Sequence, residues 1–322
     1  ILAPLLKLGH FEAVRQGLRF IFSFQDSGFK PVGRLRSTEG AIGTSGPKWL
    51  NSTGAALAIA AEYYLYTRDE DFLAEFLPRM LRGVDWIIGE LQATRTLNAD
   101  GSRPLWYGLM PFGCANDGDF GYFIAFTDAY TFAGLEKVLA VLEQTRNSRA
   151  DELRAEVEQY RNDIGQAVSG LARADGFIDR KIASGDPEEE VYTPFDKVCG
   201  AFHLVPSGAL EVDTPLFEAY VKWVERDLKD DLFYGRMDHD TSYMGWPEWA
   251  WQEIYLRRGE WKKAFALNQI NLKYAKSHDT HQVQERFRIS DPTFCPWQPN
   301  GSGNGRILDM ILKSFYFEYR DT

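Results

Sequence analysis

Paired carboxylates in aromatic-rich segments are the residues of this sequence best suited to carry chemistry. Asp117 and Asp119 lie in GCANDGDFGYF, Asp238 and Asp240 in YGRMDHDTSYMGW, and Glu285 in QVQERF. Acetal hydrolysis needs one protonated acid on the leaving oxygen and one ionised group that activates water or attacks carbon. A single acidic loop residue more often meets solvent or caps a helix. Their joint occurrence with tryptophans favours acid–base chemistry.

The segment around Glu285, residues 280–306, lies between two stretches with helical periodicity. A long irregular loop in a helical chain is usually functional or disordered. This loop contains Phe287, Phe294 and Trp297, which makes it too apolar to be typical of disorder. We expect it to form the rim of a binding cleft.

Motifs for other chemistries are missing from the sequence. The five histidines and three cysteines form no H-x-x-x-H or C-x-x-C spacing, so neither a metal nor a cofactor is expected. A P-loop, a G-x-G-x-x-G element and a G-x-S-x-G elbow are also absent. The glycine-rich run 301–306 precedes a helix and could bind phosphate there, but a tight turn is the simpler interpretation.

Composition predicts a globular protein with a sizeable core. The 322 residues are 44% hydrophobic and 25% charged, and residues 1–322 are read as a single domain. A net charge of −10 argues against nucleic acid or an anionic membrane as partner, and no apolar run approaches the ~20 residues of a membrane span. The high aromatic content, 14%, suits either carbohydrate stacking or a large core.

The cysteines and the first residue bear on localisation. Cys114, Cys199 and Cys295 are widely spaced and odd in number, which favours a reducing compartment such as the cytoplasm. The chain begins at Ile1 inside an amphipathic pattern, without features of a signal peptide. We expect a fragment or processed piece, so its localisation and oligomeric state stay open.

Periodicity predicts an all-α fold, with almost no alternation typical of strands. The expected helices are 1–24 with a turn inside it, 51–67, 69–94, 122–143, 149–171, 214–228, 247–256, 261–278 and 307–319. The long connections between them are 26–50, 95–119, 173–195, 229–245 and 280–306.

Short turns alternate with these long connections along the chain. Residues 8–11, 67–72 and 258–261 are tight polar turns, and each one ends at an aromatic residue, Phe11, Phe72 or Trp261. Such turns make antiparallel helix hairpins. A ring of hairpins would put all long loops on one working face, so the pattern predicts an (α/α)6 toroid, lacking the start of its first hairpin. An irregular helical domain is the alternative.

Several motifs resemble a known family in order along nearly the whole chain. Residues 46–51, GPKWLN, resemble the G-x-P-K-[FW]-N loop of the glucoamylase-type glycoside hydrolases. Residues 235–246 resemble that family's G-R-Y-x-x-D-x-Y-x-G-x-x-W segment. Gln284-Glu285 and Pro296-Trp297 resemble its late loop, which carries the catalytic base. Residues 114–123 stand where that family has its general-acid segment.

The resemblance implies a six-hairpin α/α toroid and an inverting glycoside hydrolase that acts from a chain end on a carbohydrate substrate. It implies Asp119, or else Asp117, as the general acid and Glu285 as the base. Two sets of substrate-binding residues follow: polar contacts to sugar hydroxyls, and platforms for sugar faces. The polar set is Lys48, Arg236 and Asp240; the platforms are Trp49, Trp106, Trp246 and Trp297.

Two features depart from the family's pattern. The family has glutamates after a tryptophan in its acid segment, whereas residues 116–119 read NDGD, so the acid would be an aspartate. The family's Arg-Asp pair in the first helix would lie upstream of Ile1. Other six-hairpin activities therefore stay open: a rhamnosidase-like hydrolase, a trehalase, a sugar phosphorylase, or an epimerase-like isomerase using His239 or His281. A non-catalytic carbohydrate-binding scaffold is a further alternative.

Overall fold

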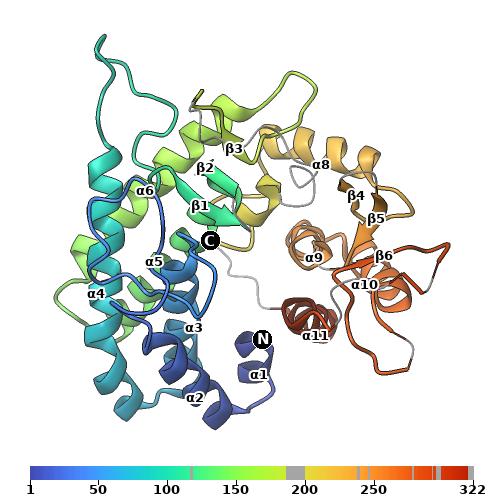
Figure 1. Ribbon diagram of the computed structural model, residues 1–322, viewed down its shortest axis with the longest axis horizontal. Helices are drawn as coiled ribbons and strands as arrows, with labels where there is room; N and C mark the ends of the chain where they lie inside the picture. The colour runs from blue at the N-terminus through green and yellow to red at the C-terminus, as the bar shows by residue number, and fades with distance from the viewer. Residues whose placement is uncertain are drawn as a thin grey trace.

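A ring of helices around a central opening organises the computed structural model (Figure 1), which describes residues 1–116, 119–185, 200–237, 240–245, 247–277, 279–291, 293–294 and 299–317. Within these ranges the backbone alone is described for residues 116, 234–237, 240 and 241. The helices are α1 (Leu2–Lys7), α2 (Phe11–Phe22), α3 (Ser52–Thr67), α4 (Glu70–Thr94), α5 (Ala129–Gln144), α6 (Ala150–Leu171), α8 (Pro215–Asp227), α9 (Glu248–Arg257), α10 (Trp261–Tyr274) and α11 (Gly301–Phe315). No helix in these ranges is both long and apolar enough to cross a bilayer.

The helices form two concentric layers. The inner layer consists of α1, α3, α5 with the preceding π-helical turn η1 (Ile124–Asp128), the 3₁₀ turn η2 (Ala201–Leu204), α9 and α11. Each inner element contacts the next, and α11 contacts α1, which closes the ring. Helices α2, α4, α6, α8 and α10 lie outside it (Figure 1). The fold is therefore an α/α toroid of helical hairpins, which confirms the predicted fold class.

The connections alternate in length as expected. Each inner helix that leads directly into its outer partner does so by a short turn, as at residues 8–10, 68–69, 145–149 and 258–260. Long connections lead from each outer helix to the next inner element. All long connections therefore enter at the N-terminal ends of the inner helices, on one face of the ring.

Local chemistry determines where several helices begin. The Asp69 side chain accepts a hydrogen bond from the Phe72 N–H at 2.9 Å and caps α4, and Thr214 caps α8 in the same way. Between α3 and α5, Gly54 and Gly134 allow backbone contact, since a Cβ on Gly134 would lie 2.5 Å from the Gly54 carbonyl oxygen. These two inner helices pack closely because neither has a side chain at the crossing.

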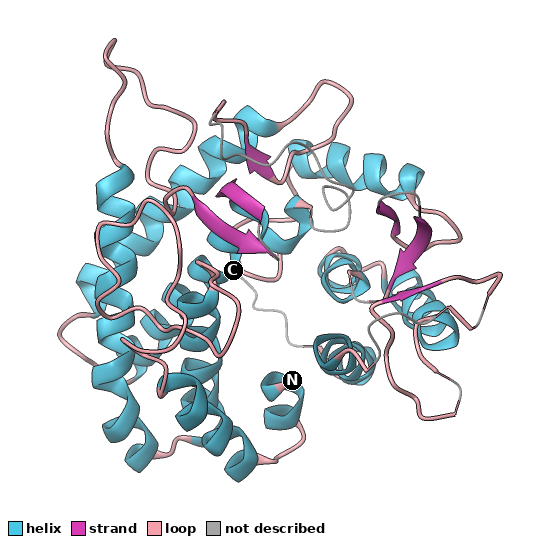
Figure 2. Ribbon diagram, viewed as in Figure 1, coloured by secondary structure: helices cyan, strands magenta, loops and turns pink. Residues whose placement is uncertain are grey.

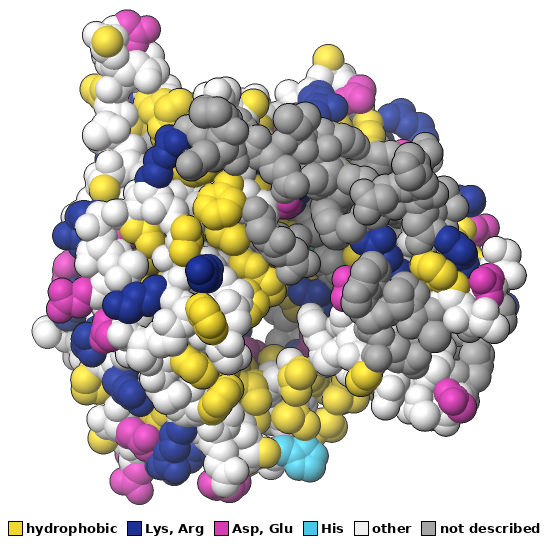
Figure 3. Space-filling view, in the orientation of Figure 1, with side chains coloured by type: hydrophobic (Ala, Val, Ile, Leu, Met, Phe, Trp, Pro, Cys, Tyr) yellow, Lys and Arg dark blue, Asp and Glu magenta, His cyan; other side chains and the backbone are white. Residues whose placement is uncertain are grey.

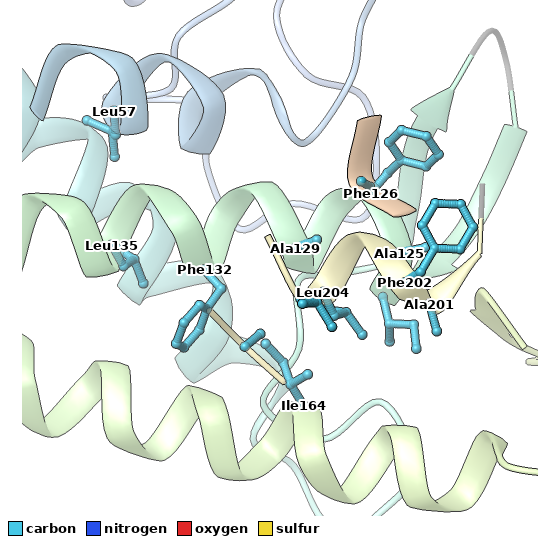
Figure 4. Packing of buried hydrophobic residues seen from close by; sticks show 14 of the residues in the cluster. Leu57, Ala125, Phe126, Ala129, Phe132, Leu135, Ile164, Ala201, Phe202 and Leu204 are labelled. Carbon is cyan, nitrogen blue, oxygen red and sulfur yellow. The ribbon is translucent and has the colours of Figure 1, made fainter. Parts of the chain in front are cut away.

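The main core lies between the layers. Figure 4 shows side chains from α3, η1, α5, α6 and η2 meeting there, with Phe132 of α5 and Ile164 of α6 pointing towards one another. Leu57, Phe132, Ile164 and Phe202 have no exposed surface. Burial of such side chains from neighbouring hairpins holds the ring together, at roughly 1.5–3 kcal/mol for each one.

Strands occur where the sequence predicted only loops (Figure 2). One antiparallel sheet has the order β1 (Gly113–Asn116), β2 (Asp119–Phe123), β3 (Lys181–Ile182). The other has the order β4 (Tyr234–Met237), β5 (Asp240–Met244), β6 (Arg286–Phe287). The sequence showed almost no alternation typical of strands, and the sheet in the described residues is correspondingly small. The strands are too short for period-two alternation to be visible, and in each sheet the third strand comes from a distant segment.

Two predicted helix starts were also wrong. The helix expected from residue 122 begins at Ala129, because β2 and the π turn η1 occupy residues 119–128. The last helix begins at Gly301 instead of residue 307. Glycine is a poor helix former, but a Cβ on Gly303 would lie 2.6 Å from Val283 Cγ1. The glycine-rich run is thus the first turn of α11, where close packing excludes larger residues.

One sector of the ring lacks an outer helix among the described residues. No described helix lies outside α1 and α11, between α2 and α10 (Figure 1). Hydrophobic side chains gather at the surface in this part of the molecule (Figure 3). On the neighbouring helices, Phe20 of α2 and Trp261 and Phe265 of α10 are exposed.

Candidate active site

The first sheet brings three of the predicted loops together. Val32 N–H donates to the Lys48 carbonyl at 3.0 Å, and Cys114 N–H donates to the Val32 carbonyl at 2.9 Å. Leu50 N–H then donates to the Cys114 carbonyl at 2.9 Å. The loop that carries Lys48 and Trp49 is therefore attached to β1, beside the hairpin that carries Asp119. Lys48 is exposed and Trp49 is half-buried.

Asp119 is the first residue of β2 and pairs with Asn116 of β1. Its side chain is buried and its Oδ2 accepts a hydrogen bond from Arg180 Nη2 at 3.0 Å. Arg180 is itself 1% exposed, with its guanidinium carbon 5.1 Å from the centre of the Phe123 ring. This is a buried, charge-assisted pair, which fixes the rotamer of Asp119.

Trp106 lies against the same hairpin. Its ring stacks on Tyr122 of β2, with 5.1 Å between ring centroids and 10° between planes. Tyr122 covers one face of the indole, so a sugar could stack only on the other face.

The second sheet carries the remaining predicted residues that the structure describes. Arg236 pairs with Thr241 and Met237 pairs with Asp240 across the β4–β5 hairpin. Their backbone positions place Arg236 and Asp240 at the same end of the β4–β5 ladder. Strand β6 then pairs with β5, Tyr243 opposite Phe287 and Met244 opposite Arg286. Glu285 comes directly before β6, so this sheet joins the Arg236 segment to Glu285. Asp117, Trp246 and Trp297 lie outside the described residues.

Backbone and side-chain contacts hold Glu285 in place. Its carbonyl oxygen accepts a hydrogen bond from Gly245 N–H at 3.0 Å, and its Oε2 accepts one from Asn300 Nδ2 at 2.9 Å. A Cβ on Gly245 would lie 2.1 Å from the Gln284 carbonyl oxygen, so only glycine permits this approach. The Glu285 side chain is half-buried.

The two sheets lie on different sides of the opening at the centre of the ring (Figure 1). The space-filling view shows the molecule hollowed at its centre (Figure 3). Strands β2 and β6 both belong to long connections, which enter the inner helices at their N-terminal ends. Asp119 and Glu285 therefore belong to the same face of the toroid and come from separate sheets.

Two buried acids beneath this face were not predicted. Burial raises the pKa of Glu248, in the first turn of α9, to about 8. Hydrogen bonds from its own backbone N–H, from Phe233 N–H and from the Asn271 amide act in the opposite direction and lower the pKa. Burial also raises the pKa of Asp128, just before α5, to about 7, although hydrogen bonds from the Tyr160 hydroxyl and Met110 N–H lower it. Both acids bind backbone of the long connections, so their role here is to anchor those connections.

Two side chains that contact the predicted acid and base were missed as well. Arg180 has no sequence signal, because only the fold brings it to Asp119. Asn300 does have one, since asparagine is a preferred N-cap residue and α11 starts immediately after it. Because the helix was predicted to start at residue 307, Asn300 was not recognised as its N-cap. Among the described residues, no three His, Cys, Asp or Glu side chains lie close enough to hold a metal ion.

Sequence comparison finds no matching protein-family model and no matching curated protein. Solved structures do match. One is a metal-independent alpha mannosidase of Streptococcus pneumoniae in a non-productive complex with alpha-1,6-mannobiose: 14% identity, TM-score 0.58, 83% of this chain and 68% of that chain covered. A wild-type glycosidase is 12% identical, with a TM-score of 0.56 and coverage of 83% and 67%.

A glycosidase variant in complex with glucose also matches, at 13% identity and a TM-score of 0.53, covering 83% of this chain and 67% of that chain. Identities this low carry information about the fold alone. The chain thus has the α/α toroid fold of these glycosidases.

Proposed function

We propose that the protein is an inverting glycoside hydrolase that releases sugar from the end of an oligosaccharide or glycoside. One observation carries the proposal. Two carboxylates, Asp119 and Glu285, belong to one face of the toroid and come from different sheets, and each has a fixed side-chain partner. Asp119 is the general acid and Glu285 is the general base. The structural neighbours, which are glycosidases, support this class of reaction.

The reaction follows from these roles. Water loses a proton to Glu285 and attacks the anomeric carbon, while the bond from that carbon to the leaving oxygen breaks. Asp119 gives its proton to the leaving oxygen. An inverting enzyme needs room for water, which corresponds to ~6.5–9.5 Å between the two carboxyl groups.

The substrate-binding roles divide between the two sheets. Lys48, Trp49 and Trp106 accompany Asp119 on the first sheet, while Arg236 and Asp240 accompany Glu285 on the second. A sugar bound between the sheets would contact both groups. Since solved neighbours hold alpha-1,6-mannobiose and glucose, α-mannosides and α-glucosides are the first substrates to test.

The test uses a panel of aryl glycosides together with alpha-1,6-mannobiose and glucose disaccharides. Proton NMR of the first product formed should show the anomer opposite to that of the substrate. Glu285→Gln should lose activity on every substrate. Asp119→Asn should lose activity on disaccharides but keep much of it on dinitrophenyl glycosides, whose leaving groups need no proton. A first product with the same anomeric configuration as the substrate, or full activity of Glu285→Gln, would refute the mechanism.

The same panel decides between Asp119 and Asp117. Asp117 is the acid if Asp117→Asn loses activity on disaccharides but keeps it on dinitrophenyl glycosides, while Asp119→Asn loses activity on all substrates alike. Asp119 would then bind a sugar hydroxyl as an ion-paired carboxylate. Added phosphate gives the control for a phosphorylase, which would form a sugar phosphate even in Glu285→Gln.

A further inference from the structure

Asn300 uses both ends of its side-chain amide at the boundary between the Glu285 loop and α11. Its Oδ1 accepts a hydrogen bond from Gly303 N–H at 2.6 Å and so caps the helix. Its Nδ2 donates to Glu285 Oε2 at 2.9 Å. A single short side chain therefore joins the start of an inner helix to the carboxylate proposed as the base.

The chemistry of the partners allows only one orientation of this amide. A backbone N–H can only donate and an ionised carboxylate can only accept. A flipped amide would point its NH₂ group at Gly303 N–H and its oxygen at Glu285, which would break both bonds. The helix cap thus determines that a donor, and not an acceptor, faces Glu285.

Two further hydrogen bonds tie the segment before Glu285 to the start of α11. Asn300 N–H donates to the Val283 carbonyl at 3.0 Å, and Val283 N–H donates to Asn304 Oδ1 at 2.7 Å. Val283, two residues before Glu285, therefore both accepts and donates a hydrogen bond at the start of α11. The position of Asn300 relative to the Glu285 segment is consequently set by the first turn of α11.

We infer that Asn300 is a positioning residue that orients Glu285, using the N-terminal turn of α11 as its support. This inference rests on the proposed function, in which Glu285 is the general base. The donor holds Oε2 of Glu285, and this bond sets the orientation in which the carboxylate meets the attacking water. Loss of this donor leaves Glu285 able to ionise but badly oriented.

The test separates orientation of Glu285 from simple helix capping. Asn300→Asp retains an equally good cap, because Asp and Asn rank together at the N-cap position. It replaces the donor with a negative charge next to Glu285. The acidic limb of the pH profile of kcat/KM should then move to higher pH by about one unit, and kcat should fall about 10–100-fold. The melting temperature should stay within about 2 °C of the wild-type value.

Two further variants complete the experiment. Asn300→Ser keeps an oxygen cap without adding charge, and should lower kcat with no shift of the acid limb. Thr214→Asp exchanges one good cap for another on the outer helix α8, and should leave both kcat and the limb as in the wild type.

The outcomes distinguish failure of the inference from failure of the proposed function. If Glu285→Gln keeps full activity, Glu285 is not the base and both fall. If Glu285→Gln is inactive but Asn300→Asp has wild-type kcat and an unshifted acid limb, Asn300 is only a helix cap. That result would overturn the inference and leave the proposed function standing.

Discussion

Arg180 and Asp119 form an ion pair in the interior of the protein, with 3.0 Å between Nη2 and Oδ2 and with side chains that are 1% and 10% exposed. Arg180 comes just before β3, and Asp119 begins β2. The pair thus holds the third strand of the sheet against the hairpin that carries the proposed acid.

Removal of Arg180 should be costly because it leaves the Asp119 carboxylate buried without this counter-charge. Arg180→Ala should lower the free energy of unfolding by roughly 3 kcal/mol, measured by urea denaturation. The double variant Arg180→Ala/Asp119→Asn should be more stable than the sum of the single changes predicts, with a coupling energy above about 1 kcal/mol. A coupling energy below about 0.5 kcal/mol would contradict a buried pair.

Gly245→Ala should disturb the position of Glu285. The added Cβ would lie 2.1 Å from the Gln284 carbonyl oxygen, so β5 and the residues before β6 must move apart. We expect activity to fall at least tenfold and unfolding to become easier by about 1–3 kcal/mol. Gly165→Ala on the outer helix α6 is the matched control, since a Cβ on Gly165 meets nothing within 4 Å. Equal activity of the two variants would argue against this role of Gly245.

Glu248 should make the protein less stable as pH rises. Burial raises its folded pKa to about 8, above the value of an unfolded glutamate, so the folded state binds the extra proton between those values. The contribution is fully present below about pH 4 and is lost as pH approaches 8. The free energy of unfolding should fall by up to about 1.4 kcal/mol per pH unit from this group.

Glu248→Gln removes that dependence without adding charge. Asn271 Oδ1 has no hydrogen-bond partner among the described residues, so a flipped Asn271 amide could accept from the NH₂ group of the introduced glutamine. Urea denaturation at pH 5, 6 and 7 should give a slope against pH that is flatter by about 1.4 kcal/mol per unit than in the wild type. Identical slopes would mean that Glu248 is ionised in the folded protein.

Asp309 should affect stability in the opposite direction. Burial alone would raise its pKa, but Lys313 and Lys7 together lower the pKa to about 2. Its stabilising effect is present above about pH 4 and is lost as pH falls towards 2. Since Lys7 belongs to α1 and the other two residues to α11, this contact joins the two helices that close the ring.

Asp309→Asn should therefore flatten the acid-induced unfolding curve between pH 4 and pH 2, by about 2 kcal/mol in all. Asp151→Asn is the control, because Asp151 is an exposed acid on the outer helix α6. An unchanged curve for Asp309→Asn would contradict the ion pairing across the closure.

Much of the ring was readable from the sequence alone. Apolar residues at helical spacing and short polar turns such as 258–260 predicted the hairpins, because these patterns depend only on neighbours in the chain. The alternation of short turns with long connections then predicted the toroid and its working face. The segment that contains Glu285 was selected in the same way, from its length and its aromatic content.

Tertiary contacts decided the rest. The strands formed because segments as distant as β2 and β3 supply each other's backbone partners, and no local pattern records such pairing. Arg180 meets Asp119 through the pairing of β2 with β3, and Asn300 meets Glu285 because the segment before α11 folds back on the start of that helix. The sequence by itself determined which elements form and which residue types the long loops carry. The packing of the ring decided which of those side chains meet, since that depends on contacts between residues far apart in the chain.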